Sequence, residues 1–320
     1  MPDMTAAASG RSMSVHPAMM DPWTAATAWG AGSVVGLLTA TQGPAYRDPG
    51  AAIAIGADGR LAGALTSGCI ESDLIVHAEE IRRTGQARRL RYGDGSPFFD
   101  LRLPCGGAID ILLFEVKDFD VLGDLSRARR DRRPVAVAVS QDGRLSLEDW
   151  RPTGEEDTLF HLSFRPALRF LIFGTGAEPA VFSGLLRGMG YDHFLVSHDE
   201  ATLAPARAAG NAVKQIRCPA ALQNLQVDTD TAIVLFYHDH DHEPEVLRSM
   251  LGTSAFYIGA QGSRATHARR LAVLQDMGMA SADLTRISSP IGLIPSSRDP
   301  KALAISVLAE VLDYHARKSA

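Results

Sequence analysis

The second half of the chain alternates short apolar runs with segments of helical character, and this alternation constrains the fold more than any other feature. Strands are predicted at 168–173, 193–197, 231–237 and 255–260, and helices follow at 181–190, 201–210, 244–251 and 263–278. Strands that alternate with helices form parallel sheets with helices packed on both faces. The pattern predicts an α/β fold with a C-terminal Rossmann-like parallel-sheet domain, closed by a last helix that Asp299 caps.

The first half shows a different pattern, in which short strand-like runs surround a single helix. These runs lie between Ser33 and Val116, with the helix expected from Ile70 to Gly85. Asp58-Gly59 is a typical centre of a hairpin turn, and a second hairpin is expected around Asp142-Gly143. The first half is therefore predicted to be a small N-terminal α+β domain.

Two stretches of the chain carry no clear periodic pattern. Residues 1–20 lack the apolar core of a secretory signal, so we expect a disordered tail. Residues 151–168 are polar and rich in turn formers, so we expect a linker there, with the domain boundary near Pro166. The predicted organisation is a tail over 1–20, an α+β domain with its linker over 21–165, and a Rossmann-like domain over 166–320.

Composition excludes several classes of function. With 37 acidic and 32 basic residues the net charge is −5, which does not favour a nucleic acid as partner. No uninterrupted apolar stretch reaches the roughly 18 residues of a transmembrane helix. Three cysteines, Cys69, Cys105 and Cys218, do not suit a disulfide framework, so we expect free thiols, a reducing compartment and a cytoplasmic protein. We place Cys218 in a strand of the second domain.

A glycine turn follows the first strand of the second domain, where dinucleotide-binding folds hold a pyrophosphate. Gly174 and Gly176 fit that pattern, but Pro179 stands at the third glycine position and Glu178 adds a carboxylate to the first helical turn. The acidic residue that would bind a ribose comes late, at Asp199. Three readings stay open: an NAD(P)-dependent oxidoreductase, a Rossmann-type domain that binds another ligand, and a turn needed only for packing.

A second strand-to-helix corner is expected at the same edge of the sheet. Ser263 can cap the helix that follows Gly262, and Arg264 adds a guanidinium beside the N–H groups of the first turn. We therefore predict that an anionic part of a ligand binds between Gly174–Gly176 and Gly262–Arg264. The alternative is a capped helix with a surface arginine.

Two cysteines stand beside glycines in the first domain. Cys69 follows Ser67-Gly68 at the expected start of a helix, whose positive end favours a thiolate and so a metal centre or a sulfur-bearing ligand. Cys105 precedes Gly106-Gly107, where two glycines let a ligand or another backbone segment approach closely. A buried structural cysteine is the alternative for Cys69, and neither cysteine has the spacing of a zinc site.

Three charged segments fit ordinary surface roles better than binding roles. His238–His242 alternates histidine with aspartate, but no second ligand cluster accompanies it, so we expect a solvated loop and no metal site. The arginine runs Arg82–Arg91 and Arg127–Arg133 are expected to be solvated faces, with docking to an acidic partner as the alternative. No nucleophile triad or proton-donor pair accompanies the glycine turn, so no catalytic residue is predicted.

Several long and unusual strings of residues add to these motifs. In the first half they are GPAYRDPGAAIAI, TSGCIE and PCGGAIDILL, and in the second half FYIGAQGSRATHARR and SPIGLIPSSRDPKALAISVLAEVL. With these strings the chain resembles the XdhC/CoxI family of molybdenum hydroxylase maturation factors over most of Ser33–Val116 and Arg169–Asp313. It departs from that pattern at GTGAEPA, where relatives commonly have GxGH, and at Ser197, where they have an aspartate.

The resemblance implies a chaperone, not an enzyme: a protein that binds the molybdenum cofactor, protects its sulfurated form and inserts it into a xanthine dehydrogenase or aldehyde oxidoreductase. The cofactor would be molybdopterin, plain or in its cytosine dinucleotide form. The implied partners are the large subunit of the apo molybdenum hydroxylase, a cysteine desulfurase and a molybdopterin nucleotidyltransferase, and a homodimer is expected. By position, the resemblance points to Cys69 as the thiol that contacts the cofactor. Gln42, Arg47 and Cys105 are further candidate binding residues, among which the site is to be sought if Cys69 is structural.

Overall fold

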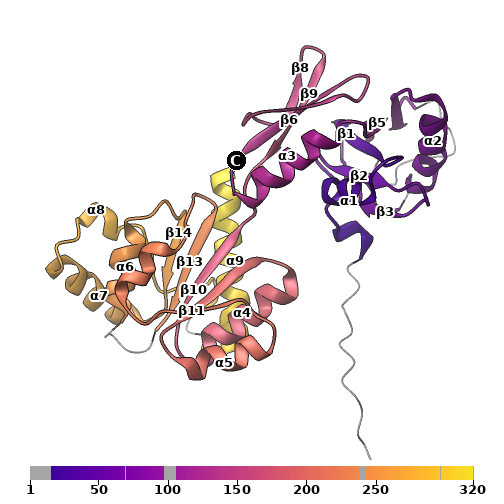
Figure 1. The fold of residues 1–320 in the computed structure, drawn as a ribbon. Coiled ribbons are helices and arrows are strands. Elements are labelled where there is room, and N and C mark those ends of the chain that lie inside the picture. Colours follow the sequence, from indigo (N-terminus) through magenta and orange to yellow (C-terminus); the bar gives the residue numbers. More distant parts are fainter. Residues whose placement is uncertain (1–15, 69, 97–105, 238–241, 296, 320) are drawn as a thin grey trace, which may run out of the picture. The chain divides into compact units, whose positions relative to one another are not determined.

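A computed structural model of the chain describes residues 16–68, 70–96, 106–237, 242–295 and 297–319 (Figure 1). The chain divides into two compact units, residues 1–166 and 167–320. The described part begins at His16, ahead of the expected domain start at residue 21. There Pro17–Met19 form a 3₁₀ turn (η1), which precedes helix α1, Pro22–Trp29.

The first unit is built on a five-stranded antiparallel sheet. Its strand order is β3 (Leu61–Gly63), β2 (Ala52–Ile55), β1 (Val34–Gln42), β5 (Ala108–Glu115) and β4 (Arg88–Gly93). Helix α2 (Glu71–Thr84) covers one face, where its Leu74 and Ile81 share a buried cluster with Val34 of β1. Side chains alternate along β1, so Val35 and Leu37 belong to a different core on the opposite face.

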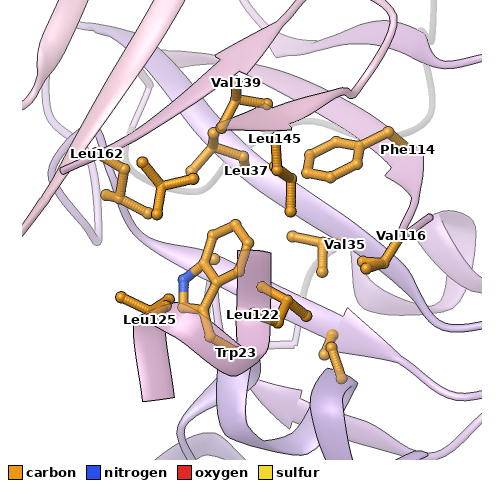
Figure 2. Packing of buried hydrophobic residues seen from close by; sticks show 14 of the residues in the cluster. Trp23, Val35, Leu37, Phe114, Val116, Leu122, Leu125, Val139, Leu145 and Leu162 are labelled. Carbon is orange, nitrogen blue, oxygen red and sulfur yellow. The ribbon is translucent and has the colours of Figure 1, made fainter. Parts of the chain in front are cut away.

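That opposite core is shared with a second sheet. The second sheet has four antiparallel strands in the order β7 (Leu145–Asp149), β6 (Val135–Ser140), β9 (Leu159–Phe164) and β8 (Gly154–Glu156). Trp23 of α1 and Leu125 of α3 (Phe119–Arg130) pack with Leu37, Val139 and Leu162 from the two sheets (Figure 2). Two sheets and two helices of the first unit therefore bury one common core.

Residues expected to form the linker belong to this second sheet. Strands β8 and β9 form a hairpin that turns at Asp157, whose φ is 55°, and Phe160 and Leu162 are buried. A linker beginning at residue 151 was wrong, because the polar residues occupy the turn and the edge strand, whereas the apolar ones alternate along β9. Both hairpins expected from Asp-Gly pairs are present, between β2 and β3 and between β6 and β7.

The second unit is a six-stranded parallel sheet, as the alternation of strands and helices predicted. Its order is β12 (Val213–Gln215), β11 (Asp192–Ser197), β10 (Arg169–Gly174), β13 (Thr231–Phe236), β14 (Tyr257–Ala260) and β15 (Ile287–Ser288). All five neighbouring pairs are parallel. Numbered from its first strand, the unit has the Rossmann order 3-2-1-4-5-6, which reverses between β10 and β13.

Helices cover both faces of this sheet. Helices α4 (Ala177–Met189), α5 (Glu200–Ala208) and α9 (Pro300–Ser319) pack on one face around Phe170 and Phe236. The 3₁₀ helix η2 (Pro219–Asn224) and helices α6 (Glu243–Leu251), α7 (Arg264–Asp276) and α8 (Ser281–Leu284) cover the other face around Leu171 and Leu235. Asp299 caps α9 by accepting a hydrogen bond from the Ala302 N–H at 3.0 Å, as predicted. Within the residues described, no helix has both the length and the apolar character to cross a membrane.

Candidate functional site

The carboxyl edge of the parallel sheet is where ligands of open α/β folds bind, in the crevice where the strand order reverses. In this chain the crevice lies between β10 and β13. The strands end level with one another, since Gly174 of β10 pairs with Phe236 of β13, and Phe173 pairs with Val196 of β11. The residues that follow these strands, together with the helix N-termini beside them, make up the candidate site.

The glycine turn after β10 is shaped by its packing against β13. Gly174 has a φ of 148°, and a Cβ atom on it would lie 2.3 Å from the carbonyl oxygen of Phe236, so no side chain fits there. The Gly176 N–H donates to the Thr202 hydroxyl at 2.8 Å. Packing therefore accounts for Gly174, and one N–H group that a phosphate would use is already bonded within the protein.

Asp199, the acidic residue nearest to the expected ribose-binding position, serves as the cap of α5. Its carboxylate accepts hydrogen bonds from the N–H groups of Ala201 and Thr202 at 3.1 and 2.9 Å, and from the Thr202 hydroxyl at 2.5 Å. The hydroxyl bond, assisted by the backbone N–H groups, holds the pKa of Asp199 below its usual range. A ribose would have to displace these bonds, so the geometry does not support dinucleotide binding.

The helix N-termini near this edge differ in charge. Carboxylates stand in the first turns of α4 (Glu178), α5 (Glu200) and α6 (Glu243 and Glu245), whereas the first turn of α7 has none. An anion is therefore favoured at the start of α7 and disfavoured at the glycine turn.

The start of α7 has the features predicted for it from the sequence. Ser263 caps the helix by accepting a hydrogen bond from the Thr266 N–H at 3.1 Å. Arg264 is exposed and makes no ion pair or hydrogen bond within the described part of the chain. The corners at Gly174–Gly176 and Gly262–Arg264 lie two strands apart, about 10 Å at the usual strand spacing, with β13 between them.

A buried ion pair holds three loops of this edge together. Arg270 of α7 and Glu243 of α6 lie 2.9 Å apart, with side chains only 1% and 2% exposed. The same guanidinium donates to the Gln261 carbonyl oxygen at 2.6 Å and to the Ser289 hydroxyl at 3.0 Å. Arg270 thereby positions the β14–α7 corner, the start of α6 and the loop after β15 relative to one another.

Three aromatic rings meet at the same edge. His198 directly follows β11, Tyr237 directly follows β13, and His242 directly precedes α6. The rings of His198 and Tyr237 are within 7° of parallel with centroids 6.4 Å apart, and the His242 ring lies 3.9 Å from that of His198. Tyr237 is buried, His198 is half-buried and His242 is exposed.

In the first unit, Gln42 lies next to the segment that follows Cys105. Gln42 ends β1 and pairs with Ala108 of β5. A Cβ atom on Gly107 would lie 2.1 Å from the Pro44 carbonyl oxygen, so this glycine admits another backbone segment. The Gln42 side-chain oxygen accepts a hydrogen bond from Arg91, whose guanidinium also binds Asp110 at 2.8 Å.

Arg47 has different neighbours, in the exposed loop between β1 and β2. Its guanidinium carbon lies 5.0 Å from the centroid of the Tyr46 ring, and it forms no ion pair with any residue that the structure describes. A cavity of about 350 Å³ is lined by Arg47 together with Trp23, Gly50 and Phe164. Arg47 therefore faces α1 and β9, whereas Gln42 is tied to β4 and β5.

Cys69 and Cys105 lie outside the described residues. Helix α2 begins just after Cys69, at Glu71, whose carboxylate accepts hydrogen bonds from the Thr66 hydroxyl at 2.9 Å and the Ile70 N–H at 3.1 Å. Glu71 therefore adds a negative charge to the positive end of α2, a charge that the prediction from the helix dipole left out.

Two other sequence predictions concern Cys218 and the histidine segment. Cys218 is exposed and directly precedes the 3₁₀ helix η2, so its placement in a strand was wrong; β12 already ends at Gln215. Residues 238–241 lie outside the described part. Inside it, no group of three or more His, Cys, Asp or Glu side chains is arranged to hold a metal ion.

Several arginines of the two basic runs are tied into the first unit. Arg82 donates to the carbonyl oxygens of Gly32 and Gly56 at 2.7 and 2.8 Å. Arg129 forms two hydrogen bonds of 2.9 Å with the carboxylate of Asp21. These arginines are structural. The charge pattern of the sequence predicts either a solvated face or docking to an acidic partner, and neither describes this role.

Known proteins match both units. The model of the XdhC Rossmann domain matches residues 170–311, and that of the XdhC and CoxI family matches residues 28–93. The molybdenum cofactor insertion chaperone PaoD of Escherichia coli (strain K12) is 34% identical over 284 residues, which cover 88% of this chain and 83% of PaoD. The chain belongs to the XdhC and CoxI family. The resemblance found in the sequence is thereby confirmed.

Two more distant relatives of this XdhC and CoxI family protein carry the name xanthine dehydrogenase. A protein of Bacillus subtilis (strain 168) named as a probable xanthine dehydrogenase subunit is 19% identical over 317 residues, covering 89% of this chain and 94% of that protein. A crystal structure described as a xanthine dehydrogenase from Bacillus halodurans superimposes with a TM-score of 0.72 at 20% identity, covering 89% and 92% of the two chains. This likeness shows that the two proteins share a fold.

The ring cluster and the buried ion pair were not predicted from the sequence. Each ring residue directly follows a buried strand or precedes a helix, so its place at the carboxyl edge was available as a signal. The pairing of Arg270 with Glu243 had no such signal, because charged residues are usually exposed and these two are 27 residues apart.

Proposed function

We propose that this protein binds the molybdenum cofactor and inserts it into a client enzyme. The observation that carries the proposal is the 34% identity with PaoD along 88% of this chain. PaoD is named as an insertion chaperone and not as an enzyme. The cofactor is thus treated as cargo that the protein carries.

The carboxyl edge of the second unit supports a carrier rather than a nicotinamide enzyme. Asp199 is bonded to the start of α5, and Gly176 already donates to Thr202, so two groups that would hold a dinucleotide are in use. The acid-free start of α7 with Arg264 suits an anionic group such as the phosphate of a pterin cofactor. We assign the anionic end of the cargo to Gly262, Ser263 and Arg264, with Gly174 and Gly176 bordering the same edge.

The finer features of the proposal come from the family. We propose that the client is a molybdenum hydroxylase of the xanthine dehydrogenase or aldehyde oxidoreductase type, and that the protein protects the sulfurated cofactor before insertion. A cysteine desulfurase and a molybdopterin nucleotidyltransferase are the expected further partners, and a cytoplasmic homodimer is the expected form. Whether the pterin carries a cytosine nucleotide is decided by analysis of the bound cargo.

The test of function is purification of the full chain from cells that make the cofactor. We expect molybdenum and a pterin to remain bound after gel filtration, and the loaded protein to activate an apo molybdenum hydroxylase. We also expect NADH and NADPH to show no saturable binding at micromolar concentration. Substrate-dependent oxidation of either nucleotide, with no molybdenum or pterin bound, would overturn the proposal.

Within this function we propose that Cys69 contacts the molybdenum end of the cargo, with Gln42, Arg47 and Cys105 as further groups of the first unit. Serine matches cysteine in size but supplies no thiolate, so Cys69→Ser should leave the free energy of unfolding nearly unchanged and remove most of the bound molybdenum. Cys218→Ser is the matched control, because Cys218 is an exposed free thiol. Equal molybdenum contents in the two variants would make Cys69 structural.

A further inference from the structure

The ring cluster of His198, Tyr237 and His242 lies at the carboxyl edge of the sheet, and the proposed function assigns it no role. Strands β11 and β13 flank β10, so their backbones are about 10 Å apart at the usual strand spacing. The ring centroids of His198 and Tyr237 are nevertheless only 6.4 Å apart. The two rings therefore lean toward each other across the end of β10, at the crevice where the strand order reverses.

The register of the sheet places these rings on the face that α6 and α7 cover. Val196 and Leu235 belong to the core on that face, and side chains two residues further along a strand point the same way. His198 and Tyr237 are those residues, and Tyr237 itself belongs to that core. The third ring, His242, stands at the start of α6.

The anion-favouring corner is the next neighbour of the rings on this face. Leu235 of β13 pairs with Ala260 of β14, and the Gln261 N–H continues the pairing by donating to the Leu235 carbonyl oxygen at 2.9 Å. Continued two residues beyond Leu235 and Ala260, this register puts Tyr237 level with Gly262, at about 5 Å if the usual strand spacing holds past the strand ends. The rings and the Ser263–Arg264 corner therefore lie at one edge of the sheet, where the exposed His242 and Arg264 give this surface an aromatic part and a cationic part.

We propose that this surface binds a planar heteroaromatic ring, stacked on His198 and His242, whose anionic substituent reaches Arg264. Aromatic side chains bind flat heterocycles by stacking, and a guanidinium beside a helix N-terminus binds an oxyanion. The proposal rests on the proposed function and orients its cargo, because a pterin and a nucleobase are both flat heterocycles. It also keeps the anionic end at the start of α7 and away from the glycine turn, where Glu178 opposes an anion.

The test uses three soluble probes with the full chain: pterin, which has no anionic group, 6-carboxypterin, which has one, and cytidine. Binding of the two pterins is measured by quenching of their fluorescence, and binding of cytidine by calorimetry. Comparing the affinities shows whether the stacked ring is a pterin or a nucleobase. We expect saturable binding of at least one heterocycle. His198→Ala and His242→Ala should weaken it about five- to hundredfold, and His198→Phe should retain it because the flat ring is kept.

The control variants separate stacking from nonspecific effects. His315→Ala removes an imidazole that also contacts an aromatic ring, Phe256 at 5.3 Å, and should leave binding unchanged. Arg264→Ala should abolish the preference for 6-carboxypterin over pterin, because it removes the guanidinium that binds the carboxylate. His242 is exposed, so its variant stays informative even if His198→Ala fails to fold.

Two results would overturn the inference: wild-type protein that binds neither heterocycle, or equal binding by the His198, His242 and His315 alanine variants. Its failure is distinct from failure of the proposed function. Protein that leaves cofactor-producing cells loaded with molybdenum, but with retention unaffected by His198→Ala, would keep the function and reject the stacking surface. Protein that stacks pterin on these rings but never carries molybdenum would do the reverse.

Discussion

Arg264 is the residue at which the proposed anion site is most directly tested. It is exposed at the start of α7, and Arg264→Ala removes one charged hydrogen bond, worth about 1.5–3 kcal/mol or roughly ten- to hundredfold in affinity. The measurement is the molybdenum and pterin retained after gel filtration. Arg269→Ala is the matched control, because Arg269 is also exposed on α7. Equal retention by both variants would make Arg264 an ordinary surface residue.

Asp199 gives the second unit a predictable response to acid. Its pKa is lowered in the folded chain, whereas aspartate in unfolded chains has a pKa of about 3.9. The charged carboxylate therefore stabilises the fold fully at neutral pH, and this contribution is lost as the pH falls through the folded-state pKa. Asp199→Asn keeps a capping side chain and loses the charge. Denaturant unfolding should show the largest difference between parent and variant near pH 7 and a shrinking one toward about pH 3; a constant difference would contradict the assignment.

At the scale of elements, the Arg270–Glu243 pair connects α6 and α7 with the loop after β15. Arg270→Met leaves the buried carboxylate without its guanidinium partner, so we expect a loss of about 3–5 kcal/mol in the free energy of unfolding. The double variant Arg270→Met with Glu243→Leu should recover much of that loss, because no buried charge remains. Urea unfolding of the three proteins measures both effects. If Arg270→Met unfolds like the parent, the ion pair does not stabilise this edge.

The elements that could be predicted from the sequence are those with a regular local pattern. The alternation of strands and helices after Leu168 led to the parallel sheet, and the Asp-Gly pairs led to two hairpins. Strands β8 and β9 were missed because their apolar alternation is short and polar turn residues dominate the segment. Their pairing with β6 depends on contacts between distant residues, which local periodicity does not report.

For the candidate site, too, only the features with a local sequence pattern could be predicted. Strand ends and helix starts can be located from the sequence, and so the corners at Gly174 and Ser263 were placed at one edge. What those corners bind was not predictable. The Thr202 hydroxyl accepts the Gly176 N–H and donates to the Asp199 carboxylate, and no sequence motif marks this threonine. The role of Cys69 rests on family resemblance, since a thiol near a helix start has structural and functional uses alike.

At the scale of the whole molecule, the two units differ in their sheets and hydrophobic cores and in the part of the cofactor that each is proposed to bind. The first buries two cores around an antiparallel sheet, and the second buries one core on each face of a parallel sheet. Matches to separate family models, residues 28–93 and 170–311, fall in different units. The proposed binding residues are divided between the two units, so variants in each unit should be measured separately before they are combined.

The parallel sheet of the second unit also determines where a reporter group can be attached. Because each helix returns to the amino edge before the next strand, the turns at Gly190, between α4 and β11, and Gly278, after α7, lie opposite the candidate site. Apart from the adjoining residues, no heavy atom of the described chain lies within 4 Å of the position that a Cβ would take at either glycine. A fluorophore or peptide tag inserted beside them would leave the carboxyl edge unobstructed, so a signal from the opposite edge of the sheet would report the transfer of cargo in real time.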